Sequence, residues 1–180
     1  QPHSSAMSRL RTVVPDSSTV LELVRDVRRG QPPQTVLLLD ALQLKQVGGD
    51  AEKATGKKFI EETGVFFCEP EYFDIFKNTW LAGDPSVLKD PGQVVLARSM
   101  AVKYFGDWKN ALGKVIRIEN AMDMKVSGIM EDIPGNSDFP TTVIGSYITI
   151  KNNGYYGYNP DWGNTTSAFQ IFMRLPENTS

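Results

Sequence analysis

The chain has 180 residues, of which 41% are hydrophobic, and this size and composition fit one globular domain or two small lobes. Its 19 lysine and arginine residues against 21 aspartate and glutamate residues give a net charge of −2, too little to attract nucleic acid by charge. One cysteine, Cys68, and one histidine, His3, exclude an internal disulfide and a metal site of clustered thiolates and imidazoles. We therefore expect no cofactor, no metal and no nucleic-acid partner.

No stretch of the sequence has the length and apolarity of a membrane-spanning helix, which needs about 20 mostly apolar residues. The longest uncharged run, Phe139 to Ile150, is too short and contains Pro140 and Gly145. The chain does not open with a charged segment followed by an apolar one, so any export signal or anchor is expected outside it.

The N-terminal part of the chain predicts one helix and one strand. Thr19 and Glu22 have the spacing of a capping box, so we expect a helix from about residue 18 to the glycine at 30. The β-branched and leucine-rich residues 35–47 predict a strand, which the glycine pair at 48–49 would turn.

An aromatic block follows, in which residues 57–63 and 64–67 are extended candidates and Glu71 to Phe76 is a short helix introduced by Pro70. Aromatic side chains dominate the energetics of a core when they are buried, and packed interiors deform little. This block is therefore expected to make the protein stiff, through Phe66, Phe67, Tyr72, Phe73, Phe76 and Trp80.

The rest of the chain mixes strands with few helices. A helix is expected from Arg98 to Phe105, ending at Gly106, and a turn at residues 120–122 predicts a hairpin. Strands and helices do not alternate regularly as in βαβ units, so the expected fold class is α+β. The predicted strands are Thr79–Leu81, Gln93–Ala97, Lys114–Glu119, Asp123–Glu131, Thr141–Ile150 and Ala168–Leu175.

Motifs for phosphate binding and nucleophilic catalysis are incomplete. A phosphate loop has four residues between its glycines, but six lie between Gly106 and Gly113, and residues 49–58 fail in the same way, so two ordinary turns are expected. His3 lies near the start of the chain, where it is not expected to assist a serine nucleophile. Cys68 follows two phenylalanines and is expected to be a buried small hydrophobe.

Acidic residues leave two functions open, a carboxylate-dependent hydrolase and a calcium site. In each case a structural explanation, solvated charge or an Asx-type turn, is the simpler alternative. A carboxylate pair could serve a hydrolase, although the turn around residues 119–123 is a place where charge is normally solvated. Oxygen ligands near the turn at 134–135 could bind calcium, although an Asx-type turn is favoured because the EF-hand spacing is absent. The hydrolase candidates are Glu119, Asp123, Glu131 and Asp132. The calcium candidates are Asp132, Asn136 and Asp138.

The segment 151–164 is rich in tyrosine, asparagine and glycine and is the best surface candidate in the sequence. Such side chains stack on sugars or make adaptable contacts with proteins. Alternatively, they pack back onto the body of the protein. The candidate contact residues are Tyr155, Tyr156, Tyr158 and Trp162.

Four blocks stand out for their order and spacing: GVFFCEPEYFDIFKNTWLAGD at 64–84, VVLARSMAVKYFG and ALGKVIRI within 94–118, KVSGIMEDIPGNSDF at 125–139, and the closing strand within 162–175. Together they resemble the MacB-like periplasmic core domain of FtsX/LolC-type ABC transporter permeases. The resemblance covers residues 57–176, whereas the first fifty residues match it less clearly.

This resemblance implies a two-lobed extracytoplasmic domain between the first two membrane helices of a permease. A porter-like (ferredoxin-like) α+β lobe would comprise residues 10–91 and 165–180, without its last helix. A smaller inserted mixed α/β lobe would comprise 92–150, and 151–164 would be a connecting loop.

In function, the resemblance implies a non-catalytic domain on the periplasmic side of a bacterial inner membrane, which relays motion driven by an ABC ATPase. Its implied partners are that ATPase subunit or domain, a second permease copy, and a periplasmic adaptor or substrate protein. The alternatives are a carbohydrate- or protein-binding module of the cell envelope that uses the Tyr155–Trp162 loop, and a carboxylate-dependent hydrolase.

Overall fold

The computed structural model describes residues 34–40, 45–135, 137, 140–153 and 169–174, and all structural statements below concern these residues. The helix predicted from about residue 18 lies outside them. The candidate contact residues Tyr155, Tyr156, Tyr158 and Trp162 lie outside them as well.

Strands dominate the described residues, and the helices are few and short, which confirms the α+β class. The strands are β1 (Gln34–Asp40), β2 (Lys45–Gly49), β3 (Phe59–Glu61), β4 (Val65–Cys68), β5 (Trp80–Ala82), β6 (Gln93–Ala97), β7 (Val115–Ile118), β8 (Met122–Met130), β9 (Val143–Ser146) and β10 (Phe169–Arg174). The α-helices are α2 (Asp50–Thr55), α3 (Tyr72–Ile75), α4 (Arg98–Phe105) and α5 (Tyr147–Asn153). Two 3-10 helices are η1 (Pro85–Lys89) and η2 (Trp108–Asn110).

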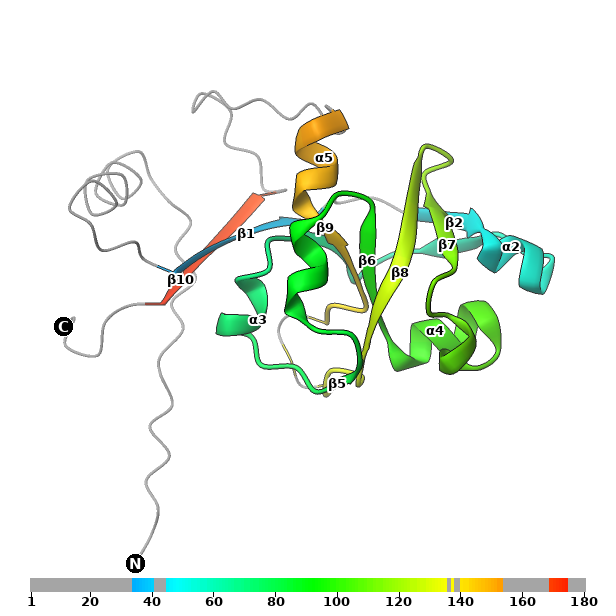
Figure 1. The fold of residues 1–180 in the computed structure, drawn as a ribbon, viewed down its shortest axis with the longest axis horizontal. Helices are drawn as coiled ribbons and strands as arrows, with labels where there is room; N and C mark the ends of the chain where they lie inside the picture. Colours follow the sequence, from blue (N-terminus) through cyan, green and yellow to red (C-terminus); the bar gives the residue numbers. More distant parts are fainter. Residues whose placement is uncertain (1–33, 41–44, 136, 138–139, 154–168, 175–180) are drawn as a thin grey trace, which may run out of the picture.

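One sheet runs through the molecule in the order β10-β1-β4-β9-β6-β8-β7-β2-β3, and β5 pairs separately with β8 (Figure 1). The pairs β4–β9 and β6–β8 are parallel, and the other pairs are antiparallel. The strands of residues 92–150 are therefore contiguous in the middle of this order. The division of the chain into a porter-like lobe and an inserted lobe stays a prediction.

The hydrophobic core lies along the central strands. Every residue of β4 and β9 is buried, as expected for strands covered on both faces. From Met122 to Val126, β8 instead alternates between buried and exposed side chains. This alternation indicates that the sheet has one open face at the end formed by β8, β7 and β2.

The predicted aromatic block belongs to this core. Phe73 lies 4.7 Å from Trp80 between ring centroids. Phe76, in turn, lies 4.9 Å from Tyr72 and 5.1 Å from Phe172. These contacts join α3 to β5 and β10, although Phe76 and Trp80 themselves are only half-buried. The four residues of the block that are buried are Phe66, Phe67, Tyr72 and Phe73.

The single strand predicted over residues 35–47 is wrong. The structure divides it into β1, which pairs with β4 and β10, and β2, which pairs with β3 and β7 at the other end of the sheet. Gly48 and Gly49 continue β2 instead of turning it, and α2 begins directly after them. The expected turn at 49–58 is therefore a helix.

The strand predicted over residues 141–150 is only partly right. Strand β9 ends at Ser146, and α5 begins at Tyr147 and continues to Asn153, into the predicted loop. Tyr147, Thr149 and Ile150 are all buried. Packing against the body thus overrides the β-propensity of this β-branched run.

Candidate functional site

The four candidate acids each have their own structural partner. Glu119 Oε1 accepts a hydrogen bond of 2.7 Å from the backbone N–H of Gln46, and Glu119 is half-buried, whereas Asp123 is exposed as expected for a turn carboxylate. Glu131 Oε1 lies 3.6 Å from Arg98 Nη1. Asp132 Oδ1 accepts from the backbone N–H of Ser99 at 3.0 Å.

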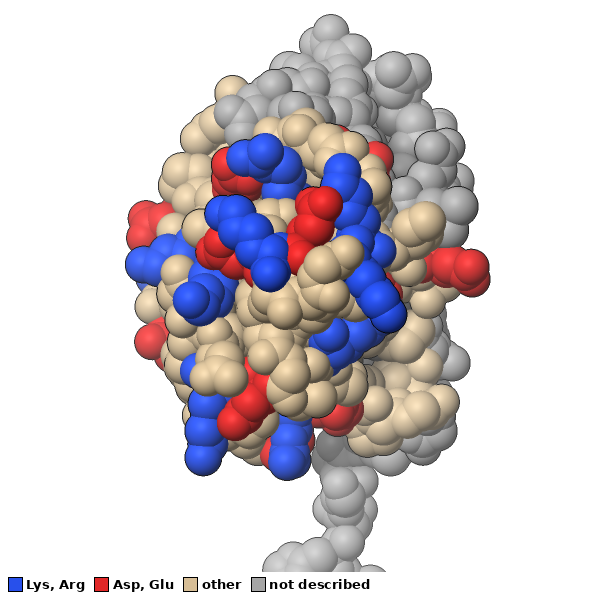
Figure 2. All heavy atoms as spheres, turned by 90° about the vertical axis from the view of Figure 1, so that its right-hand side faces the viewer, with Lys and Arg blue, Asp and Glu red and all other residues tan. Residues whose placement is uncertain are grey.

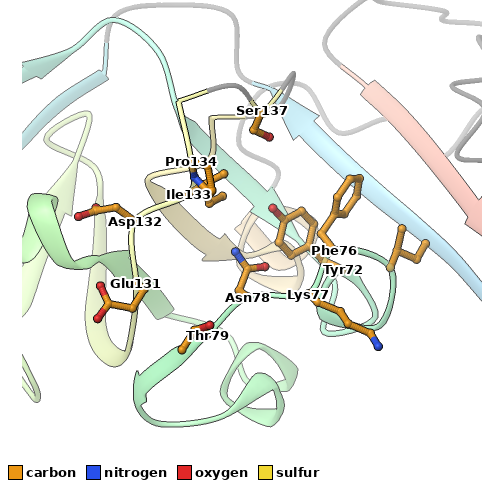
Figure 3. Close-up of a pocket in the computed structure, with 11 residues that line it drawn as sticks. Tyr72, Phe76, Lys77, Asn78, Thr79, Glu131, Asp132, Ile133, Pro134 and Ser137 are labelled. Carbon is orange, nitrogen blue, oxygen red and sulfur yellow. The ribbon is translucent and has the colours of Figure 1, made fainter. Parts of the chain in front are cut away.

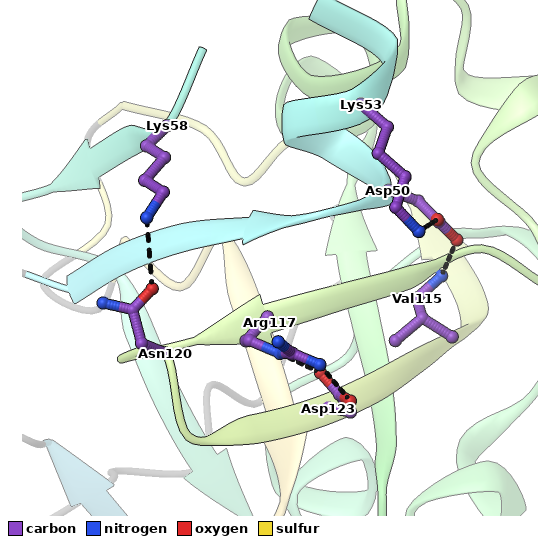
Figure 4. A network of polar contacts seen from close by, with 7 residues as sticks. All are labelled: Asp50, Lys53, Lys58, Val115, Arg117, Asn120 and Asp123. Atoms are coloured by element: carbon purple, nitrogen blue, oxygen red, sulfur yellow. Dashed lines mark hydrogen bonds and ion pairs between the residues drawn. The ribbon is translucent and has the colours of Figure 1, made fainter. Parts of the chain in front are cut away.

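Asp123 belongs to a group of polar contacts on β7 and β8 and the neighbouring α2 (Figure 4). Arg117 Nε and Nη2 donate to its two carboxylate oxygens at 2.6 and 2.7 Å, and these hydrogen bonds hold the pKa of Asp123 below its usual range. Near this ion pair, the carboxylate of Asp50 accepts hydrogen bonds from the backbone N–H of Val115 at 2.9 Å and from Lys53 Nζ at 3.1 Å. The bond from Val115 to Asp50 joins α2 to β7, and the contacts of Arg117 with Asp123 join β7 to β8, so both carboxylates have structural roles.

The hairpin predicted around residues 120–122 is confirmed, since β7 pairs with β8 through a tight turn. Both Glu119 and Asn120 have positive φ, at 55° and 57°, which is the geometry of a type I′ hairpin turn. Gln46 fastens this turn to β2, because its side-chain oxygen accepts from Asn120 Nδ2 at 2.6 Å and its backbone carbonyl accepts from the N–H of Glu119 at 2.8 Å.

The structure also shows where the single cysteine, the glycines of the incomplete phosphate loop and the described part of the calcium candidates lie. Cys68 is fully buried in β4, and burial raises the pKa of its thiol, so the prediction of a buried small hydrophobe is confirmed. The glycines 106 and 113 flank the end of α4 and the η2 turn. Among the described residues no group of three or more His, Cys, Asp or Glu side chains is placed to hold a metal ion, and Asn136 and Asp138 lie outside them.

Charges of both signs are mixed on the end of the molecule that carries α2, α4, β2 and β7 (Figure 2). Ion pairs account for part of this mixing: Lys53 lies 3.1 Å from Asp50, and Lys103 lies 2.8 Å from Glu61. This end therefore does not present a field of one sign.

A pocket of about 500 Å³, here called the α3–β5 pocket, lies between the α3–β5 connection and the segment that follows β8 (Figure 3). Tyr72, Phe76 and Asn78 line it from one side. Glu131, Ile133 and Pro134 line it from the other. Its volume is within the range of ligand pockets, about 300 to 1,000 Å³.

Asn78 is one of the polar residues that line this pocket, together with Lys77, Thr79, Glu131, Asp132 and Ser137. The oxygen Oδ1 of Asn78 is buried, and no hydrogen-bond donor of the described residues reaches it. In Figure 3 the amide points into the space between Tyr72 and Pro134, whereas the carboxylates of Glu131 and Asp132 point away from it. No local pattern in the sequence points to this site, because Asn78 and Ile133 meet only through the pairing of β5 with β8.

None of the helices in the described part of the chain has the length and apolarity that a membrane crossing requires. No curated protein matches the sequence. The family described as the MacB-like periplasmic core domain matches residues 2–180.

Two solved structures are similar in fold. A domain of a provisionally described permease protein from Porphyromonas gingivalis has a TM-score of 0.62 at 18% identity, covering 81% of this chain and 62% of that one. The periplasmic region of MacB from Actinobacillus actinomycetemcomitans has a TM-score of 0.58 at 14% identity, covering 89% of this chain and 66% of that one. The chain thus spans a little under two thirds of each of these solved chains. It belongs to the MacB-like periplasmic core domain family, the periplasmic part of ABC transporter permeases.

Proposed function

We propose that this chain acts as a stiff, non-catalytic body that relays motion driven by an ABC ATPase to a protein in the periplasm. The ATPase would act through the membrane part of the permease, and a second permease copy would complete the assembly. The protein that receives the motion would be a periplasmic adaptor or a substrate protein.

The observation that carries this proposal is the continuity of the packed body. A single sheet extends from β10 to β3, and the rings of Trp80, Phe73, Tyr72, Phe76 and Phe172 form a chain of contacts across it. Packed interiors have low compressibility and transmit strain. A force applied at one end of such a body moves the other end with it.

Distance measurements by double electron–electron resonance in the full-length transporter test the relay. Nitroxide labels at Ile60→Cys and Lys89→Cys would lie at exposed positions on β3 and η1, and Cys68 is buried away from the label. The distance between the two labels of one domain should be the same with and without ATP. The distance between Ile60→Cys labels of two permease copies should change.

An ATPase-inactive variant provides the control, because neither distance should then respond to ATP. A domain whose internal distance changes as much as the distance between copies is deformable, and that result would overturn the proposal.

A further inference from the structure

We propose that the free edge of β3 pairs with the β3 strand of a second copy of this chain, antiparallel and about a two-fold axis that passes between the two Ile60 residues. The pairing forms in one state of the ATPase cycle and separates in another. The inference rests on the proposed function, since it names the surface through which two permease copies meet.

The first observation is that β3 has a free side. It ends the sheet, and among the described residues no strand pairs with it other than β2. On β2, the N–H and carbonyl of Gln46 both face Glu119, since the N–H donates to Glu119 Oε1 and the carbonyl accepts from the Glu119 N–H. Gln46 lies opposite Ile60, and opposite residues of an antiparallel pair either bond to each other or both point outward. The N–H and carbonyl of Ile60 therefore point to the free edge.

The second observation is the order of the exposed side chains around Ile60. This isoleucine is 62% exposed, and Lys58 and Glu62, two residues before and after it, are exposed as well. Phe59 and Glu61 lie on the other face, where the ring and the carboxylate both contact Tyr104 of α4. Because side chains alternate along an extended chain, the open face of β3 presents lysine, isoleucine and glutamate in that order.

This order is complementary to itself. A two-fold axis at Ile60 sets the two isoleucines opposite each other, where they exchange two backbone hydrogen bonds. The same axis sets Lys58 of each copy opposite Glu62 of the other, and opposite charges directly across a ladder stabilise it. Sliding one strand by two residues sets Ile60 opposite a charge, and sliding it by four sets two lysines or two glutamates opposite each other. The charges therefore select one register and a second copy of this chain as the occupant.

Lys58 can reach such a partner. Its Nζ lies 3.5 Å from Asn120 Oδ1 in Figure 4, a long hydrogen bond between exposed groups. A carboxylate is a stronger acceptor for an ammonium than this neutral amide. The pairing of so short a strand is weak between separate molecules, but two permease copies in one assembly hold their domains at a high effective concentration. The pairing is therefore expected in the assembled transporter.

Disulfide crosslinking of the full-length transporter in membrane vesicles, with and without ATP, tests the register. On oxidation with copper phenanthroline, Ile60→Cys should join two copies in one nucleotide state, because the Cα atoms of a hydrogen-bonded pair lie about 5.5 Å apart, within reach of a disulfide. The double variant Lys58→Cys/Glu62→Cys should also form crosslinks, whereas neither single variant should. Lys89→Cys, at an exposed position in η1, is the control and should not form the crosslink. Cys68 is buried, and the original permease gives the background.

Charge reversal tests the ion pairs across the two-fold axis. With Ile60→Cys present, Lys58→Glu alone or Glu62→Lys alone should slow crosslinking at least about threefold, because like charges then face each other. The two reversals combined should restore the rate. Lys57→Glu changes the net charge as Lys58→Glu does, but Lys57 would lie opposite Thr63, so this exposed neighbour should leave the rate unaltered.

Four results would overturn the pairing. Absence of the Ile60→Cys crosslink in every nucleotide state would show that the charges on β3 keep other strands away from this edge. A crosslink of Ile60→Cys to a different protein alone would assign the edge to another partner. Crosslinking of Lys58→Cys by itself as fast as the double variant would contradict the register, and a combined reversal that stays slow would contradict the ion pairs.

The relay and the strand pairing fail separately. A deformable domain changes the distance between Ile60→Cys and Lys89→Cys of one copy, but it does not change which cysteines meet across β3. Absence of the crosslinks leaves that internal distance constant.

Discussion

The hydroxyl of Tyr104 on α4 donates a hydrogen bond of 2.9 Å to the carboxylate of Glu61 on β3. Lys103 Nζ donates to the same carboxylate at 2.8 and 2.9 Å. Glu61 is only 7% exposed, so these donors offset the cost of burying its charge. Burial and the nearby Glu61 charge both raise the pKa of Tyr104, so its hydroxyl remains a donor at neutral pH. The hydrogen bonds from Tyr104 and Lys103 to Glu61 hold β3, the last strand of the sheet, against α4.

Tyr104→Phe is expected to reduce the free energy of unfolding by about 2 kcal/mol, because a hydrogen bond to a charged, buried group is lost while the ring is kept. Urea unfolding followed by circular dichroism measures the difference. The m-value should be unchanged, since the variant buries the same surface.

Lys103→Met provides the comparison. The side chain of Lys103 is 44% exposed, but that of Glu61 is only 9% exposed, so removing the ammonium leaves a buried carboxylate with fewer donors, and the expected loss is about 1 to 3 kcal/mol. If either variant lost less than about 0.5 kcal/mol, the side chain that it removes would not be needed to compensate the burial of Glu61.

Gly145→Ala is expected to destabilise the protein through a direct clash in the core. A Cβ at this position would lie 2.6 Å from both Cδ1 and Cε1 of Phe67, which is fully buried and has no room to move away. Overpacking of this kind costs about 1 to 3 kcal/mol. Gly135→Ala is the matched control, because its Cβ would meet nothing within 4 Å, and thermal unfolding of both variants should separate them.

Residues with a strong local pattern were predictable from the sequence. The β7–β8 hairpin shows alternating apolar residues around a short turn, and α4 ends at Gly106, where the expected C-terminal glycine lies. The burial of Phe73 was predictable for the same reason, since its whole neighbourhood is aromatic. In these segments, local preference and tertiary packing agree.

Segments whose structure depends on distant partners were not predictable. The polar sequence of α2 buries only Ala51, so it lacks an apolar stripe, and its anchor is the hydrogen bond from Val115 to Asp50. The α3–β5 pocket forms only because β5 pairs with β8, which brings residues 77–79 beside 131–134. Pairings over such sequence separations leave no periodic signal in the chain.

Phe73→Ala is expected to cost about 3 to 5 kcal/mol, the range for removing a buried aromatic ring. Phe73 is 7% exposed and its ring contacts both Trp80 and Tyr72, so its removal leaves a cavity between α3 and β5. Chemical denaturation measures the loss. Val102→Ala on the exposed side of α4, where the valine is 41% exposed, should change stability by less than about 0.5 kcal/mol. A loss below about 1 kcal/mol for Phe73→Ala would contradict the stiff aromatic core.

The carboxylate of Asp50 predicts a specific dependence of stability on pH. The hydrogen bond from the backbone N–H of Val115, and secondly the one from Lys53, lower the pKa of Asp50 in the folded protein. A carboxyl whose pKa is depressed by folding stabilises the protein above its unfolded pKa, about 3.9 for aspartate, and this contribution is lost as the pH falls through the folded pKa.

Asp50→Asn should therefore be less stable than the original chain above about pH 4, because the charge that attracts Lys53 and accepts strongly from Val115 is gone. Below that pH the two stabilities should converge as Asp50 becomes protonated. Urea unfolding at a series of pH values from about 6 down to 3 measures the difference. Asp90→Asn, at an exposed aspartate, is the control and should track the original chain throughout. A difference between Asp50→Asn and the original chain that stays constant down to the lowest pH would show that the charge of Asp50 does not hold α2 to β7.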